Sequence, residues 1–337
     1  MKKIFNLIAS FVLLAGFSAC NKDGSDKPGL PPAPVPTVNY KGLTFISSGK
    51  STVCLAKVGA PDEITLEYST DESQWNPYTI GEKISMADGS FLLFRAGEQK
   101  NLTFSKGSDS YYHFEISGPV TAQGNIMSLL DRDFSTPLST NAFFALFEGC
   151  TSLLSAPELP ATTMEQGCYF RMFAECTGLK SAPELPAKEL AYNCYGWMFK
   201  GCSALTYVPD LPATEMVSYC YNNMFANCTS LKFAPELPAT RLDMGCYHCM
   251  FEGCTSLTSA PELPATELVS NCYEFMYKDC RNLRYVIGLF TTEPSEKTTK
   301  DWLSGVAASG TFIKSKKATW DVTSAHGVPE GWTFETW

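Results

Sequence analysis

Apolar positions recur with two different periods along this chain of 337 residues. Between residues 40 and 119 they alternate with polar ones, as in "EITLEYST", where Ile64, Leu66 and Tyr68 share one side. A period of two predicts half-buried β-strands. Further strands are predicted at "LTFIS", "STVCLAKV", "FLLFRA", "NLTFS" and "YYHFEISG", with turn-rich pieces such as "MADGS" between strands. We therefore expect an antiparallel β-sandwich of about 80 residues.

From residue 150 to 280 the apolar positions recur every 26 residues instead, with copies beginning at 150, 176, 202, 228 and 254. The first copy reads "CTSLLSAPELPATTMEQGCYFRMFAE", and no insertion interrupts the five. One column of equivalent leucines contains Leu159, Leu185, Leu211, Leu237 and Leu263. A fixed period in the range of about 20 to 50 residues is typical of a solenoid, in which each unit buries its apolar face against its neighbours.

The segments that flank the repeats break the pattern, as terminal capping units do. Before the first copy, "NAFFALF" aligns with the later "CYxxMF" one period early, with Ala142 in place of the cysteine. We therefore predict an N-terminal cap and half-repeat over residues 120–149.

After residue 280 a sixth copy begins and then stops. "TTKDWLSGVAAS" places Trp302, Leu303 and Val306 at helical spacing, and the strand-like "GTFIK" and "GWTFETW" follow. Residues 281–337 are therefore predicted to be a C-terminal cap.

The N-terminus, "MKKIFNLIASFVLLAGFSAC", has two lysines, an apolar run and two small residues before Cys20. This predicts a secretory signal peptide over residues 1–19 and not a membrane span, because a span needs about 20 apolar residues and this run is shorter. A cysteine after a small pair resembles the lipobox of bacterial lipoproteins, which implies acylation of Cys20, with cleavage and an unmodified thiol as the alternative. Residues 20–39, with "KPGLPPAPVPT", are predicted to form an extended tether.

The repeat consensus "CxxLxxAPxLPxxxLxxxCYxxMFxxC" resembles the BspA-like, or treponemal-type, leucine-rich repeat over residues 139 to 290. Met-Phe replaces the Ala-Phe of that family, and Ala-Pro stands in the strand where the family often has isoleucine. Pro157 and its copies cannot donate a backbone hydrogen bond, which leaves the strand length open. The resemblance implies a surface-exposed lipoprotein of Bacteroidetes, anchored in the outer membrane and active in adhesion by protein binding.

Eleven of the fourteen cysteines follow the repeat, in columns that begin at Cys150 and Cys168. Exported proteins often form disulfides, but equivalent side chains of a regular ladder point the same way. We therefore expect buried free thiols that act as small apolar fillers, with disulfides between the columns as the alternative. Cys249 is expected to be exposed, because its column also holds Arg171, Trp197, Asn223 and Phe275.

The net charge of -9 and the absence of a basic stripe argue against a nucleic-acid partner. One column of the repeat is acidic and contains Glu158, Glu184, Asp210, Glu236 and Glu262. We interpret it as a solvated face with Lys180 and Lys232 in nearby columns, and a strip for calcium or a cationic partner is the alternative.

Catalytic chemistry has little support in the sequence. The three histidines, His113, His248 and His326, lie in different regions, and no glycine-rich phosphate loop is present. No CxxC pair recurs with the repeat and no regularly spaced histidine accompanies the repeat cysteines, so neither a metal nor a cofactor is predicted. We therefore predict that the chain is not an enzyme.

The predicted function is that of a cell-surface lipoprotein whose leucine-rich-repeat solenoid mediates adhesion or binding to host or bacterial macromolecules. The candidate contacts are variable positions outside the core: Phe170, Tyr192, Trp197, Tyr207, Tyr219, Phe233, His248 and Phe275. The alternative is a glycan-binding accessory protein of a polysaccharide-uptake system, with Trp75, Trp197 or the C-terminal tryptophans as sugar platforms. A structural spacer is a third interpretation.

Overall fold

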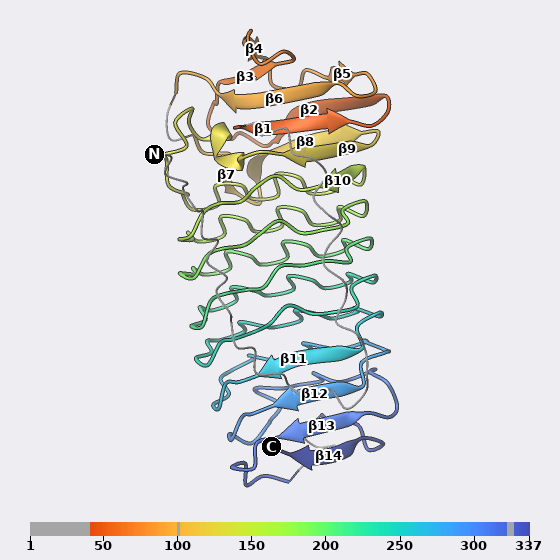
Figure 1. Cartoon of the computed structure of the whole chain (residues 1–337). Helices are drawn as coiled ribbons and strands as arrows, with labels where there is room; N and C mark the ends of the chain where they lie inside the picture. Colours follow the sequence, from red (N-terminus) through yellow and green to blue (C-terminus); the bar gives the residue numbers. More distant parts are fainter. Residues whose placement is uncertain (1–40, 100–101, 322–326) are drawn as a thin grey trace, which may run out of the picture. The chain divides into compact units, whose positions relative to one another are not determined.

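The computed structural model describes residues 41–99, 102–321 and 327–337 (Figure 1). The chain divides into two units, Met1–Thr37 and Val38–Trp337, and all described residues belong to the second unit. The predicted signal peptide, the predicted lipidation site at Cys20 and the predicted tether lie outside the described residues. The described part is β-rich, and its helical content is a single 3₁₀ turn, η1 (Ile126–Leu129).

Nine strands between residues 43 and 123 form two sheets with antiparallel pairing. The strands are β1 (Leu43–Ser47), β2 (Ser51–Val58), β3 (Leu66–Ser69), β4 (Asn76–Tyr78), β5 (Ile84–Met86), β6 (Phe91–Ala96), β7 (Ser105–Gly107), β8 (Ser110–Ser117) and β9 (Val120–Gln123). One sheet has the order β10-β9-β1-β6-β3-β4 and the other β5-β2-β8-β7. Five predicted strands are confirmed, whereas "NLTFS" contributes only Ser105, the first residue of β7.

The two sheets share a core of aromatic rings. Phe114 of β8 lies 5.0 Å from Phe45 of β1 and 5.6 Å from Phe94 of β6, measured between ring centroids, and all three side chains are buried. The rings meet edge to face, the arrangement that the aromatic quadrupole favours.

The repeats continue directly from the first of these sheets. β9 pairs with β1 on one side and, in parallel, with β10 (Leu153–Ser155) of the first repeat on the other. Residues 120–123, which the sequence assigned to the N-terminal cap, therefore form a strand of the larger sheet. The ring of Phe114 stacks on that of Phe147 at 5.1 Å, so the hydrophobic core runs without a break from the sheets into the repeats.

The Leu-Pro part of each repeat forms only short parallel contacts with the next copy. Within the described residues, β10 and β11 (Ser259–Leu263) are the repeat strands, and the copies between them make isolated bridges such as Ser181 with Tyr207. The column that begins at Pro157 lacks the amide hydrogen that a ladder needs, which explains why the strands are short.

The "CYxxMF" part of each repeat forms a chain of tight turns. Some amides bond locally, as Phe170 N donates to Gly167 O at 3.0 Å, and the alternate ones bond to the next copy, as Tyr169 N donates to Cys194 O at 3.1 Å. Every fourth residue has a positive φ, as at Gly167 (59°), Arg171 (58°) and Glu175 (59°), and the same positions repeat in all five copies. The turns are thus a regular feature of the stack (Figure 1).

Equivalent side chains stack in columns inside the repeats. The predicted leucine column that begins at Leu159 is buried, and a second leucine column, Leu153 and its four copies, is fully buried. Neighbouring rings of one aromatic column lie 5.3 to 5.7 Å apart and nearly parallel. That column contains Phe147, Phe173, Phe199, Phe225, Phe251 and Tyr277.

The C-terminal segment extends the stack through β12 (Tyr285–Gly288), β13 (Thr311–Lys314) and β14 (Thr333–Thr336), all parallel. The helical spacing expected around Trp302 was wrong, because residues 298–306 form a further turn segment. Tyr277 N donates to Trp302 O at 2.9 Å, as in the preceding copies. A chain of four-residue turns places inward side chains at nearly the period of an α-helix. The spacing of apolar residues alone therefore does not distinguish such turns from a helix.

Candidate binding surfaces

Each turn segment directs two of every four side chains into the core and two outward. In the first repeat the inward pairs are Cys168 with Tyr169 and Met172 with Phe173, all buried. We call the outward columns the turn wall; they begin at Gln166, Gly167, Phe170, Arg171, Ala174 and Glu175. The identity of these residues changes from copy to copy while the inward residues stay nearly constant.

Six of the eight predicted contact residues lie on the turn wall, as three pairs from adjacent copies. The ring centroids lie 5.9 to 6.4 Å apart in the pairs Phe170–Trp197, Tyr192–Tyr219 and His248–Phe275. Tyr207 and Phe233 lie elsewhere, on the Leu-Pro part of their repeats. The eight residues therefore belong to two surfaces.

Trp197 is held in place on the turn wall by charged neighbours. Lys200 Nζ lies 3.8 Å from the centre of the indole ring, and Arg171 Cζ lies 5.9 Å from it. The Arg171 guanidinium also pairs with the carboxylate of Glu148 in the preceding unit. These cation–π contacts orient an aromatic side chain that remains partly exposed, as a preformed binding contact requires.

A cluster that sequence reasoning missed brings a thiol close to an imidazole. Cys249 Sγ lies 3.9 Å from His248 Nε2, which lies 3.5 Å from Glu274 Oε2, and His248 Nδ1 lies 3.2 Å from Asn222 Oδ1. Cys249 is 6% exposed, so the expectation of an exposed thiol was wrong. Longer neighbours such as His248 cover this small side chain. The signal in the sequence was the dipeptide His-Cys itself.

The cluster is not prepared for nucleophilic catalysis. Burial raises the pKa of Cys249 to about 12 and lowers the pKa of His248. A nucleophilic cysteine needs a lowered pKa, because the thiolate is the reactive form. At neutral pH the thiol is therefore protonated, and the imidazole is uncharged.

The repeat thiols are free and buried, as the sequence predicted, and no disulfide joins the described cysteines. Each thiol of the column that begins at Cys150 also donates to a backbone carbonyl of the preceding unit, which the sequence did not indicate. The Sγ–O distances are 3.0 to 3.1 Å, for example from Cys202 to Phe173 O and from Cys228 to Phe199 O. These thiols are thus hydrogen-bond donors as well as fillers.

The acidic column lies on the Leu-Pro part of the repeats. Glu158, Glu184, Asp210 and Glu236 are exposed, and Glu262 is half-buried. Within the described residues, no ion pair joins these five carboxylates to a lysine or arginine. The described part of the chain also holds no group of three or more His, Cys, Asp or Glu side chains that could bind a metal ion.

The tryptophans considered as sugar platforms are mostly covered. Trp302, Trp320 and Trp332 are buried in the C-terminal segment, where they close the end of the core, whereas Trp337 is 54% exposed. Arg95 Cζ lies 3.7 Å from the centre of the Trp75 ring and occupies one of its faces.

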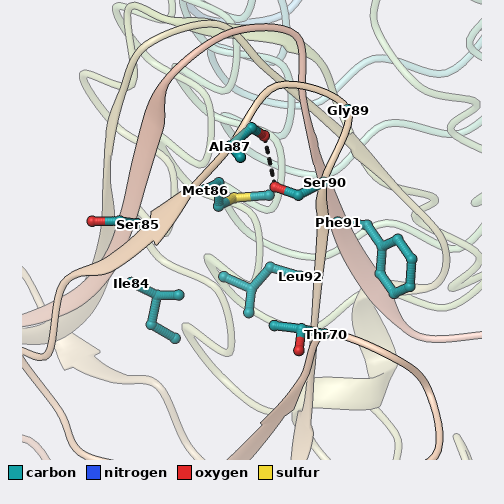
Figure 2. Close-up of a pocket in the computed structure, with 9 residues that line it drawn as sticks. All are labelled: Thr70, Ile84, Ser85, Met86, Ala87, Gly89, Ser90, Phe91 and Leu92. Carbon is teal, nitrogen blue, oxygen red and sulfur yellow. Dashed lines mark hydrogen bonds between the residues drawn. The ribbon is translucent and has the colours of Figure 1, made fainter.

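A cavity of about 260 Å³ opens between β5 and β6 (Figure 2). Its lining residues are Thr70, Ile84, Ser85, Met86, Ala87, Gly89, Ser90, Phe91 and Leu92. Ser90 Oγ donates to Ala87 O at 2.7 Å across the turn that borders it. None of the lining side chains titrates near neutral pH, so the cavity offers no general acid or base.

Comparison of the chain with protein-family models, with curated proteins and with solved structures finds no match. The resemblance to BspA-like repeats therefore stays a prediction. In the described residues, no helix is long and apolar enough to cross a membrane.

Proposed function

We propose that this chain is a non-catalytic cell-surface lipoprotein that binds macromolecules through a leucine-rich-repeat solenoid of the BspA-like type. In this proposal the N-terminal sheets form a β-sandwich and residues 150–280 form the solenoid. The observation that supports binding most strongly is the contrast between constant inward columns and variable outward ones. A rigid stack with an unconstrained outer wall is the architecture that repeat proteins use for recognition.

The proposed location follows from the N-terminus. A signal peptide that ends at a cysteine, followed by a proline-rich tether, supports export and lipid anchoring to the outer membrane. Replacement of Cys20 by serine is expected to abolish fatty-acid incorporation and to release the protein from membranes. Unchanged partitioning of the variant would refute lipid anchoring.

The turn wall is the proposed binding face for a host or bacterial macromolecule. Trp197 is its best candidate anchor, because its ring is partly exposed and already oriented by Lys200 and Arg171. Buried aromatic anchors contribute a large share of the binding energy in protein interfaces.

The glycan-binding alternative is favoured by one pair on the same wall. Tyr192 is 47% exposed and meets Tyr219 at 6.1 Å, edge to face. Asn193 and Ser218 lie directly beside these rings in the sequence and supply groups that can bond to sugar hydroxyls. Protein and glycan ligands are therefore to be screened together.

The test is a screen of the purified protein against host matrix proteins and against glycans, followed by titration of each ligand found. We expect Trp197→Ala to weaken binding by a factor of about 5 to 150, as loss of an interface anchor does, with an unchanged melting temperature. Phe334→Ala is the matched control, because it removes an exposed aromatic ring of β14 outside both proposed surfaces, and it should bind normally. Binding to neither array would support the spacer interpretation and overturn the proposal.

A further inference from the structure

The Leu-Pro parts of the repeats present a second surface, which we call the strand face. It consists of the outward columns that begin at Leu154, Ser155 and Glu158. Residues of adjacent copies lie in register there, since Thr206 N donates to Lys180 O at 3.0 Å and Arg284 N donates to Thr258 O at 3.0 Å. Neighbouring members of a column are therefore about 4.8 Å apart.

The strand face carries three stripes of different chemistry. The column that begins at Leu154 contains the exposed cations Lys180, Lys232 and Arg284. The column that begins at Glu158 is the acidic column. Between them lie Tyr207 and Phe233, which are 38% and 41% exposed. Large apolar side chains exposed side by side between charged stripes are typical of an interface.

The charges of the two outer stripes are not neutralised within one chain. Lys180 and Glu184 are four residues apart along an extended segment, or about 13 Å, which is too far for an ion pair. Among the described residues no ion pair involves Lys180, Lys232, Glu184 or Glu236. Lys180 and Lys232 therefore have the charge that would complement Glu184 and Glu236, whereas the other members of the acidic column have Leu154, Thr206 or Thr258 at the matching position.

We propose that the strand face pairs with the strand face of a second copy of this chain. A two-fold axis parallel to the direction of stacking reverses the order of the stripes but keeps the order of the copies. Lys180 then faces Glu184 of the second copy, and Lys232 faces Glu236 of the second copy. The exposed rings of Tyr207 and Phe233 meet their counterparts beside the axis.

This arrangement closes on itself, as most homodimers do, because each contact occurs twice by symmetry. A two-fold axis perpendicular to the stacking direction, in the plane of the interface, would place cations against cations, so the charges select one orientation. The face spans about five copies of 4.8 Å and about 13 Å along the strand. A face of this size buries about 600 Å² in total, below the roughly 1,200 Å² of stable specific complexes, so we expect a weak dimer that forms only at high concentration.

The test measures self-association of the full-length protein in mild detergent by sedimentation velocity. The protein concentration runs from about 5 to about 500 µM, the range in which weak complexes dissociate. Lys180→Glu and Glu184→Lys each place two like charges across the axis. We expect each to raise the dissociation constant at least tenfold, whereas the double variant should return to within about threefold of the parent protein. Lys188→Glu changes the same charge in the same repeat outside the strand face, so it should dimerise normally.

Three results would overturn the proposal. They are a parent protein that does not exceed the monomer mass at any concentration, single variants that dimerise normally, and a folded double variant that stays monomeric. Far-ultraviolet circular dichroism establishes folding of each variant. None of these results depends on Trp197, so the outcome is separate from that of the ligand screen.

Discussion

The buried thiols make the stability of this protein sensitive to alkaline pH. Burial raises the pKa of every cysteine from Cys150 to Cys280, for example from 9.0 to about 12 for Cys254 and to about 11 for Cys272. Below pH 8 the thiols are protonated in both the folded and the unfolded chain, so they do not make the free energy of unfolding depend on pH. Above pH 9 the unfolded chain binds fewer protons than the folded chain, and the free energy of unfolding falls as pH rises.

The magnitude follows from the number of thiols. Twelve cysteines lie between residues 150 and 280, and all are buried. One unfolded thiol gains about 0.4 kcal/mol by ionising at pH 9 and about 1.4 kcal/mol at pH 10, so twelve gain about 5 and about 17 kcal/mol. A typical domain is stable by about 5 to 15 kcal/mol. The repeats are therefore expected to unfold between pH 9 and 10.

The assay is urea unfolding at several pH values from 7 to 10 in the presence of a reductant, with proton release measured by difference titration. A variant with alanine at Cys176, Cys202, Cys228 and Cys254 is the matched control. It has eight of the twelve thiols, so its loss of stability between pH 7 and 10 should be about two thirds of that of the parent protein. A flat curve for the parent protein would show that the thiols are not buried and protonated in the folded state, and the reasoning would be refuted.

Substitutions at four further positions test the packing inside the repeats. Cys202→Ser should cost less stability than Cys202→Ala, since a hydroxyl can still donate to Phe173 O. The order should reverse at Cys220, whose thiol donates to the sulfur of Met216 at 3.7 Å and not to a carbonyl of the preceding unit. Thermal melts rank these four variants. Tyr195→Phe should raise the free energy of unfolding by up to about 1 kcal/mol, because the buried hydroxyl has no hydrogen-bond partner; a destabilised variant would contradict this. Leu211→Asp should lower it by several kcal/mol, measured by urea unfolding, and an unchanged midpoint would place that column outside the core.

The sequence predicted the buried columns of the repeats but not the shape of the backbone that holds them. Leucines at a fixed period predict burial whatever path the chain follows between them. The turn segment was not predicted, although glycine or asparagine holds eight of its fifteen left-handed positions, for example Gly167, Asn193 and Gly201. The middle left-handed column gives little warning of a turn, because four of its five residues are Arg171, Trp197, Cys249 and Phe275.

The candidate surface was predicted only in part, for a related reason. Variation between copies identifies outward positions, but it does not say on which side of the coil each position lies. Tyr207 and Trp197 are ten residues apart in the sequence and both variable, yet one belongs to the strand face and the other to the turn wall. The separation depends on the turns, and the turns were the part that was not predicted from the sequence.

The junction between the sheets and the repeats shows how a chain can continue a repeat without repeating its sequence. Cys150 Sγ donates to Phe114 O at 3.0 Å, as Cys176 Sγ donates to Phe147 O at 3.0 Å one copy later. β8 has no repeat motif, but it supplies the ring and the carbonyl at the place where a preceding copy would supply them. A stack of repeats must cover its apolar ends, and here the N-terminal sheets cover one end with the same contacts that join the copies to each other.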